Sequence, residues 1–279
     1  HAQQSQPADT PPDSPTALPD ITDLIDRQAS WRPVLTLRSS YEFEQDEFEY
    51  WESFVAARFT LPNFGGSLSS TLTLSVERAD VDTPSFVDLP SDLYVLAVNY
   101  AWIRRLNKDW TLRLNFNPRF ATDFENTGSD AWHPRAAAMA VYRPNSRWLV
   151  GFGLFVTGRE DVPVIAGPGA IWRPKRWVEL NLFFPQPRVS FLVTRPRERE
   201  GWFYVSGAWD GDTWAYERAN GRNNEVTYRN LKAAVGWEHG PRGGLLGRGK
   251  RGLRWHVEAG FVFNRELEFD DHVPDFEPD

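Results

Sequence analysis

The sequence predicts an all-β fold, an antiparallel up-and-down transmembrane β-barrel of about twelve strands, with fourteen as the alternative. Three observations lead to this prediction. Apolar and polar residues alternate along many short segments, aromatic residues are abundant in a chain of low mean hydropathy, and short turns alternate with long loops. Each is typical of a strand wall that meets lipid on one side and a polar interior on the other.

The alternation is clearest between Trp110 and Phe116, where every second residue is tryptophan, leucine or phenylalanine and the residues between are Thr, Arg and Asn. A period of two over about ten residues is the pattern of a half-buried strand. Strands of this kind are expected at 31–43, 48–61, 68–79, 94–102, 110–120, 135–143, 148–156, 163–173, 177–184, 188–194, 202–210, 225–238 and 252–269. Bacterial single-chain barrels have an even strand number, so one of these segments is expected to be spurious or Thr213–Arg218 to be a separate strand.

The composition fits a membrane barrel better than a soluble domain. Of 279 residues, 14% are aromatic, including 13 Trp, although the mean hydropathy is only -0.51. A barrel combines these properties because only alternate strand residues face lipid. The longest apolar runs, such as Trp148–Val156, are far shorter than the roughly 20 residues that a membrane helix needs.

Several functions are disfavoured by composition. The net charge of -7 offers no basic footprint for nucleic acid. The chain has no Cys, which excludes disulfides and thiolate metal sites, and its five His are scattered without metal-ligand spacing. We therefore expect no metal, no cofactor and no nucleic-acid partner.

The chain divides into three parts. Residues 1–30 are predicted to be a flexible Pro-rich leader, which could contact other envelope proteins. Residues 31–269 are predicted to form the barrel, and residues 270–279 an acidic tail.

Short turns that end in Trp recur along the barrel segment. They lie at Asn107–Trp110, Asn145–Trp148, Pro174–Trp177 and Glu200–Trp202, and the connections between them (80–91, 121–134 and 211–224) are mostly longer. Short turns on one rim and long loops on the other are typical of outer-membrane barrels. Because Trp rings favour the headgroup layer, an aromatic girdle is expected. Its predicted members are Trp110, Trp148, Trp172, Trp177, Trp202 and Trp255.

Alternation alone does not tell which face is inside, because a soluble β-sandwich alternates as well. The many strands, the tryptophans at strand ends and the charged residues in mid-strand favour apolar residues outside and charged residues in a lumen. The predicted lumen-lining residues are Arg38, Glu52, Arg58, Arg113, Asn115, Arg119, Lys232, Arg254, His256 and Glu258. A selective constriction and a salt-bridged plug both remain open for this set.

The second half of the chain resembles a family of bacterial outer-membrane β-barrel proteins known only as a domain of unknown function. The resemblance runs from Gly158 to Phe269. It is carried, in this order, by Pro163–Gly169, Trp172–Pro174, Leu180–Arg188, Gly201–Tyr204 and Glu258–Leu267. It implies a barrel in the outer membrane and carries over neither an activity nor catalytic residues.

These observations lead to the expectation of a non-enzymatic protein of the bacterial outer membrane, either a narrow pore or a scaffold, in contact with outer-membrane lipids. Two alternatives stay open. One is an outer-membrane hydrolase, in which His256, with Glu258 on the same strand face, would activate Ser206. The other is a secreted carbohydrate-binding β-sandwich. The solute and the oligomeric state do not follow from the sequence.

Overall fold

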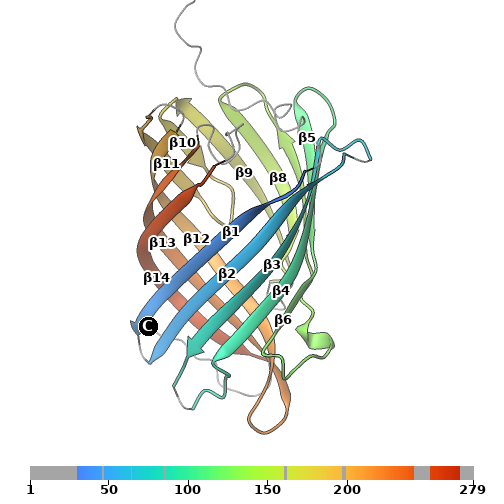
Figure 1. Cartoon of the computed structure of the whole chain (residues 1–279), viewed down its shortest axis with the longest axis vertical. Helices are drawn as coiled ribbons and strands as arrows, with labels where there is room; N and C mark the ends of the chain where they lie inside the picture. Colours follow the sequence, from blue (N-terminus) through green and yellow to red (C-terminus); the bar gives the residue numbers. More distant parts are fainter. Residues whose placement is uncertain are drawn as a thin grey trace, which may run out of the picture.

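The computed structural model is an all-β barrel with its long axis vertical in Figure 1. It describes residues 30–45, 47–63, 65–84, 86–159, 162–196, 199–241 and 252–270. Nearly all of the predicted leader and tail lie outside these ranges. The strand segments are β1 (Ser30–Gln45), β2 (Phe48–Leu61), β3 (Ser69–Asp82), β4 (Asp92–Arg105), β5 (Trp110–Asn117), β6 (Arg119–Thr122), β7 (Arg135–Tyr142), β8 (Trp148–Val156), β9 (Val164–Lys175), β10 (Val178–Asn181), β11 (Arg188–Thr194), β12 (Arg199–Glu217), β13 (Asn223–Pro241) and β14 (Trp255–Phe269). A 3-10 turn, η2, spans Ser129–Ala131.

Consecutive strands pair in antiparallel fashion along one sheet from β1 to β14. β5 and β6 both pair with β4, and Pro118 separates them. Proline has no backbone N–H to donate, so it interrupts the strand. Its carbonyl still accepts from Val98 of β4 at 3.1 Å. β5 and β6 therefore form one course of the wall, and the fourteen segments make about thirteen courses.

This odd number makes the first and last strands run the same way. Ser30 at the start of β1 pairs with Thr60, and Trp255 at the start of β14 pairs with His239, so both strands begin at the end of the barrel that carries the β4–β5 and β7–β8 turns. Within the described strand residues, no ladder joins β1 to β14. The predicted number of twelve or fourteen strands stays a prediction, because the number of strands depends on whether β5 and β6 are counted as one strand or as two.

The barrel has a wide end and a narrow end. Ala215 of β12 pairs in parallel with Thr122 of β6, and this contact closes a 9-strand ring from β4 through β12. On the narrow-end side of that contact, β7–β11 are no longer part of the wall, because β11 pairs only with the Gly201–Ser206 part of β12. The narrow end is therefore built from β1–β4, β6 and β12–β14, and the orange β12–β13 hairpin extends beyond it (Figure 1).

The narrow end has a dry core. A barrel of about eight strands has an interior that side chains alone can fill. Here Trp214 and Tyr216 of β12 and Phe48 of β2 are at most 1% exposed. The full cluster is Phe48, Tyr50, Ala79, Val81, Val87, Leu93, Val95, Ala121, Trp214, Tyr216, Val226, Tyr228, Leu267 and Phe269.

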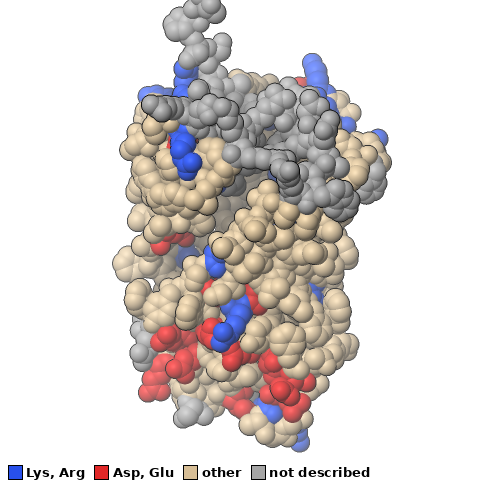
Figure 2. Space-filling view, in the orientation of Figure 1, with Lys and Arg blue, Asp and Glu red and all other residues tan. Residues whose placement is uncertain are grey.

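Large apolar side chains cover the outside of the wall. Phe261 is 82% exposed and Leu37 76%. Others that point outward are Val55, Leu74, Val98, Phe116, Phe152, Val205, Val235 and Val257. Figure 2 shows a mostly uncharged wall, with Asp and Glu gathered near the narrow end. The molecule is thus one rolled sheet with an apolar skin, rather than two sheets around a dry centre. Among the described residues, no helix is long and apolar enough to cross a membrane.

Candidate functional site: the barrel interior

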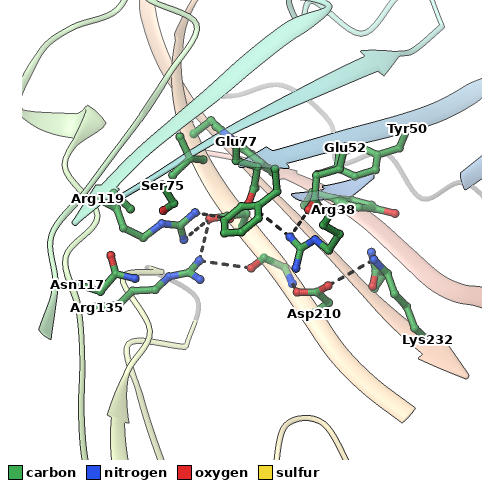
Figure 3. Close-up of a pocket in the computed structure, with 18 of the residues that line it drawn as sticks. Arg38, Tyr50, Glu52, Ser75, Glu77, Asn117, Arg119, Arg135, Asp210 and Lys232 are labelled. Carbon is green, nitrogen blue, oxygen red and sulfur yellow. Dashed lines mark hydrogen bonds and ion pairs between the residues drawn. The ribbon is translucent and has the colours of Figure 1, made fainter. Parts of the chain in front are cut away.

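A polar cavity of about 270 Å³ lies inside the barrel above the apolar core. Figure 3 shows its charged side chains converging from β1, β2, β3, β6, β7, β12 and β13. Because strand side chains alternate between faces, each contributes every second residue to this space. The ionisable lining consists of Arg38, Arg119, Arg135 and Lys232 with Glu52, Glu77, Asp210 and Asp212.

Asp212 joins two arginines on one side of the cavity. Arg119 donates from Nη1 to Asp212 Oδ1 at 2.7 Å and also bonds through Nη2, while Arg135 Nη2 donates to Oδ1 at 2.7 Å. The Asp212 carboxylate also accepts from the backbone N–H of Thr213 at 3.0 Å. The Arg119 side chain is only 4% exposed. A buried charge of this kind requires its partner, because burial removes the stabilisation that water provides.

A second set of ion pairs lines the opposite side. Arg38 Nη2 donates to Glu52, and Glu77 lies 3.6 Å away. Lys232 Nζ lies 3.3 Å from Asp210 and 3.1 Å from Glu42. Charged groups from distant parts of the chain therefore compensate one another across the lumen.

A separate cluster lies closer to the wide end. Glu238 accepts from Arg188 at 2.8 Å and also from Arg254. Ser206 donates to Glu258 Oε2 at 3.1 Å. In the described part of the chain no hydrogen bond joins Ser206 to His256, so the geometry that the hydrolase alternative needs is not assembled.

The predicted lumen-lining residues lie on the inner face. Arg38, Glu52, Arg119 and Lys232 line the cavity. Asn115 exchanges hydrogen bonds of 3.0 and 3.4 Å with Asn99. The remaining members are placed by register, Arg58 opposite Thr73, Arg113 opposite Ile103, His256 opposite Glu238 and Glu258 opposite Gly236, with Arg254 bonded to Glu238.

Sequence reasoning missed the carboxylates of β12. Asp212 falls in the connection expected at 211–224, and Asp210 is the last residue of the strand expected at 202–210. In the structure β12 continues to Glu217 in unbroken register with β13. The signal that could have found these residues is the period of two that links them to Tyr204 and Ser206.

Five of the six predicted girdle residues point outward near the wide rim. Trp148 stacks on Trp172 with ring centroids 5.2 Å apart, and Trp110 stacks on Tyr142 at 4.9 Å. Trp177 and Trp255 are 48% and 43% exposed. Trp202 differs from the prediction. It pairs with Glu238 and donates to Glu200 at 3.3 Å, so it shares the inner face of β12, while Phe203 points outward.

The loop before β7 covers the outside of β12 where the wall narrows. Thr122 and Asp123 organise the loop by accepting backbone N–H groups of residues 124–126, and Asn126 donates to the Tyr216 carbonyl at 3.5 Å. Burial lowers the pKa of His133 at the end of this loop, although the nearby Asp212 carboxylate opposes the shift. Because this loop covers them, Thr213 and Ala215 are buried although they point away from the lumen.

The described residues contain no group of His, Cys, Asp and Glu that could hold a metal ion. Comparison with known proteins gave no match. No family model, no curated protein and no solved structure matches.

Proposed function

We propose that the protein is an integral β-barrel of the bacterial outer membrane with a closed lumen, a structural component rather than an open solute pore. The observation that carries the proposal is the combination of an apolar outer wall with an apolar core across the narrow end. Exposed apolar areas of this extent mark a surface that contacts something other than water.

Three features support a membrane environment. Strands β2 to β13 are paired on both sides, which satisfies their backbone groups as hydrocarbon demands. The outward tryptophans near the wide rim suit the headgroup layer. Charged side chains in mid-strand lie inside the barrel, where hydrocarbon does not reach them.

The closed lumen follows from the narrow end. Trp214, Tyr216 and Phe48 fill it, and each is at most 1% exposed. An ion that crossed this core would lose its hydration without receiving polar ligands. A narrow pore, the alternative function, would require these side chains to move.

The proposal is tested in planar lipid bilayers. The purified, detergent-extracted full chain should migrate faster in gels when unheated, as intact membrane barrels do, and should show no conductance steps. The double variant Trp214→Ala, Tyr216→Ala should conduct, and Trp110→Ala, which removes an outward ring, should not. Conductance steps in the unaltered protein would establish the pore, and a chain that stays monodisperse in plain buffer would refute the membrane location.

A further inference from the structure

The polar cavity contains hydrogen-bonding atoms that the described part of the protein leaves unpaired. Trp214 Nε1 and Arg135 Nε are donors without an acceptor, and Asn117 Oδ1 and Asn230 Oδ1 are acceptors without a donor. The Trp214 and Asn230 residues are 1% and 2% exposed. Buried polar atoms are nearly always hydrogen-bonded, so this cavity presents both donors and acceptors to an occupant.

The lining of the cavity holds paired side chains of both signs. It includes four cationic and four carboxylate side chains, and each is engaged in the ion pairs described above. A charged ligand would have to break one of these pairs and leave its partner buried alone, which is strongly unfavourable. The lining therefore disfavours ions and suits a neutral molecule with many hydrogen-bonding groups.

The size of the cavity and its aromatic side chains narrow the class of ligand further. A volume of about 270 Å³ is near the lower limit of ligand pockets and suits a molecule the size of a monosaccharide. The rings of Tyr50, Phe54, Trp214 and Tyr228 line it beside the polar atoms. Aromatic rings offer apolar contact to the C–H faces of such a molecule, while amides and hydroxyls bond its edges. The Arg38 side chain is 47% exposed, so the cavity communicates with solvent.

We propose that this cavity is a binding site for one neutral polyhydroxylated molecule of monosaccharide size, a sugar or a cyclic polyol. The ligand sits on the apolar core, exchanges hydrogen bonds with Asn117, Asn230 and Trp214, and stacks on the aromatic lining. This inference goes beyond the proposed function and does not depend on it, since binding requires neither a membrane nor a closed lumen.

The test is isothermal titration calorimetry on the detergent-solubilised full chain with glucose, myo-inositol and glucose 6-phosphate. At least one neutral probe should bind with a dissociation constant in the range of about 0.1–10 mM, and the phosphate should bind at least about tenfold more weakly. The variant Ser75→Leu places a larger side chain in the cavity and should weaken binding by about tenfold or more. The matched variant Ser53→Leu lies on the outer face of β2 and should bind as the unaltered protein does.

Four outcomes would overturn the inference. They are no heat with either neutral probe up to about 100 mM, tighter binding of the phosphate, equal binding by Ser75→Leu, or loss of binding in Ser53→Leu. Heat-dependent gel migration verifies that each variant is folded. If Ser75→Leu fails to fold, Ala97→Leu, which fills the cavity from β4, replaces it. The ligand series on the unaltered protein decides between a neutral and an anionic ligand without any variant.

Discussion

Asp212 is the residue on which most of the buried charge in the cavity depends. It forms ion pairs with both Arg119 of β6 and Arg135 of β7. Among the described residues, no carboxylate other than Asp212 forms an ion pair with Arg119. These ion pairs therefore connect β12 to β6 and β7 at the height where the barrel narrows.

Replacing Asp212 by Asn should destabilise the barrel strongly. The variant leaves the buried Arg119 guanidinium and the partly exposed Arg135 guanidinium without this negative partner, and breaking a buried pair costs about 3–5 kcal/mol. The free energy of unfolding is measured by reversible urea unfolding in lipid vesicles. The control is Arg78→Met, which removes the exposed outer-face bridges to Asp80 and Asp92 and should change stability little. Similar losses in the two variants would contradict this role for Asp212.

Gly169 makes room for a ring inside the wide part of the barrel. A Cβ added at Gly169 would lie 2.1 Å from Phe183, whereas at Gly167, on the same face of β9, it would meet nothing within 4 Å. Gly169→Ala should therefore cost about 1–3 kcal/mol in the same unfolding measurement, and Gly167→Ala much less. Adding Phe183→Leu to Gly169→Ala should recover part of the loss; equal effects of the two alanines would show that Phe183 does not occupy this position.

At single positions, the alternation of strand residues was a good guide to whether a side chain faces the lumen or the outside. The rule that strand residues alternate placed Arg38, Glu52 and Lys232 correctly, because one strand residue of known direction fixes the others. The error at Trp202 came from a different expectation, that a Trp after a short turn points outward, because the alternation itself places Trp202 on the inner face with Ser206. The distances that assemble the cavity were not predictable, because they join residues of widely separated strands.

Among the elements, β12 and β13 differ most from the sequence prediction. Both have 19 residues and pair over their whole length, although the sequence indicated a loop at 211–224. The extension lets β12 reach β6 and form the narrow end. The part of the expected loop up to Glu217 is instead held in the sheet by cross-strand pairing, which depends on the partner strand and not on local sequence.

β1 and β14 are the elements with unpaired edges. Their residues from Val34 to Ser39 and from Trp255 to Phe261 are exposed on both faces, inward-pointing ones included. Near the narrow end the same two strands draw together, since Arg265 lies 3.9 Å from Glu42 and its guanidinium lies over the Phe48 ring. The seam is therefore open toward the wide end and packed by side chains at the narrow end.

Hydrogen exchange should reveal this seam. Every second amide of a strand paired on one side only lacks a partner, so alternate amides of Val34–Ser39 and Trp255–Phe261 should exchange quickly. Amides of β3, which pairs on both sides, should exchange slowly and serve as the control. The measurement is residue-resolved exchange in detergent micelles. Slow exchange along all of β1 and β14 would indicate that the two strands pair in parallel and close the ring.

At the scale of the whole molecule, the odd number of courses sets the topology. β1 begins at the wide end and β14 ends at the narrow end, so the first and last strand residues lie at opposite ends of the barrel. The sequence alone produced the same conflict, because about thirteen alternating segments were found and an even number was preferred on general grounds. The turns at the wide rim are mostly short, which in outer-membrane barrels is the periplasmic side.

Epitope tags test this topology directly. A tag after Phe269 should be accessible to antibody on intact cells, and a tag before Ser30 should become accessible only after the outer membrane is permeabilised. Tags in the β7–β8 turn and in the β12–β13 turn are internal controls, because the register places them at the wide and narrow rims. If both terminal tags are accessible from the same side, the barrel has an even number of membrane crossings. The seam between β1 and β14 would then have to hold one more strand than the described residues provide.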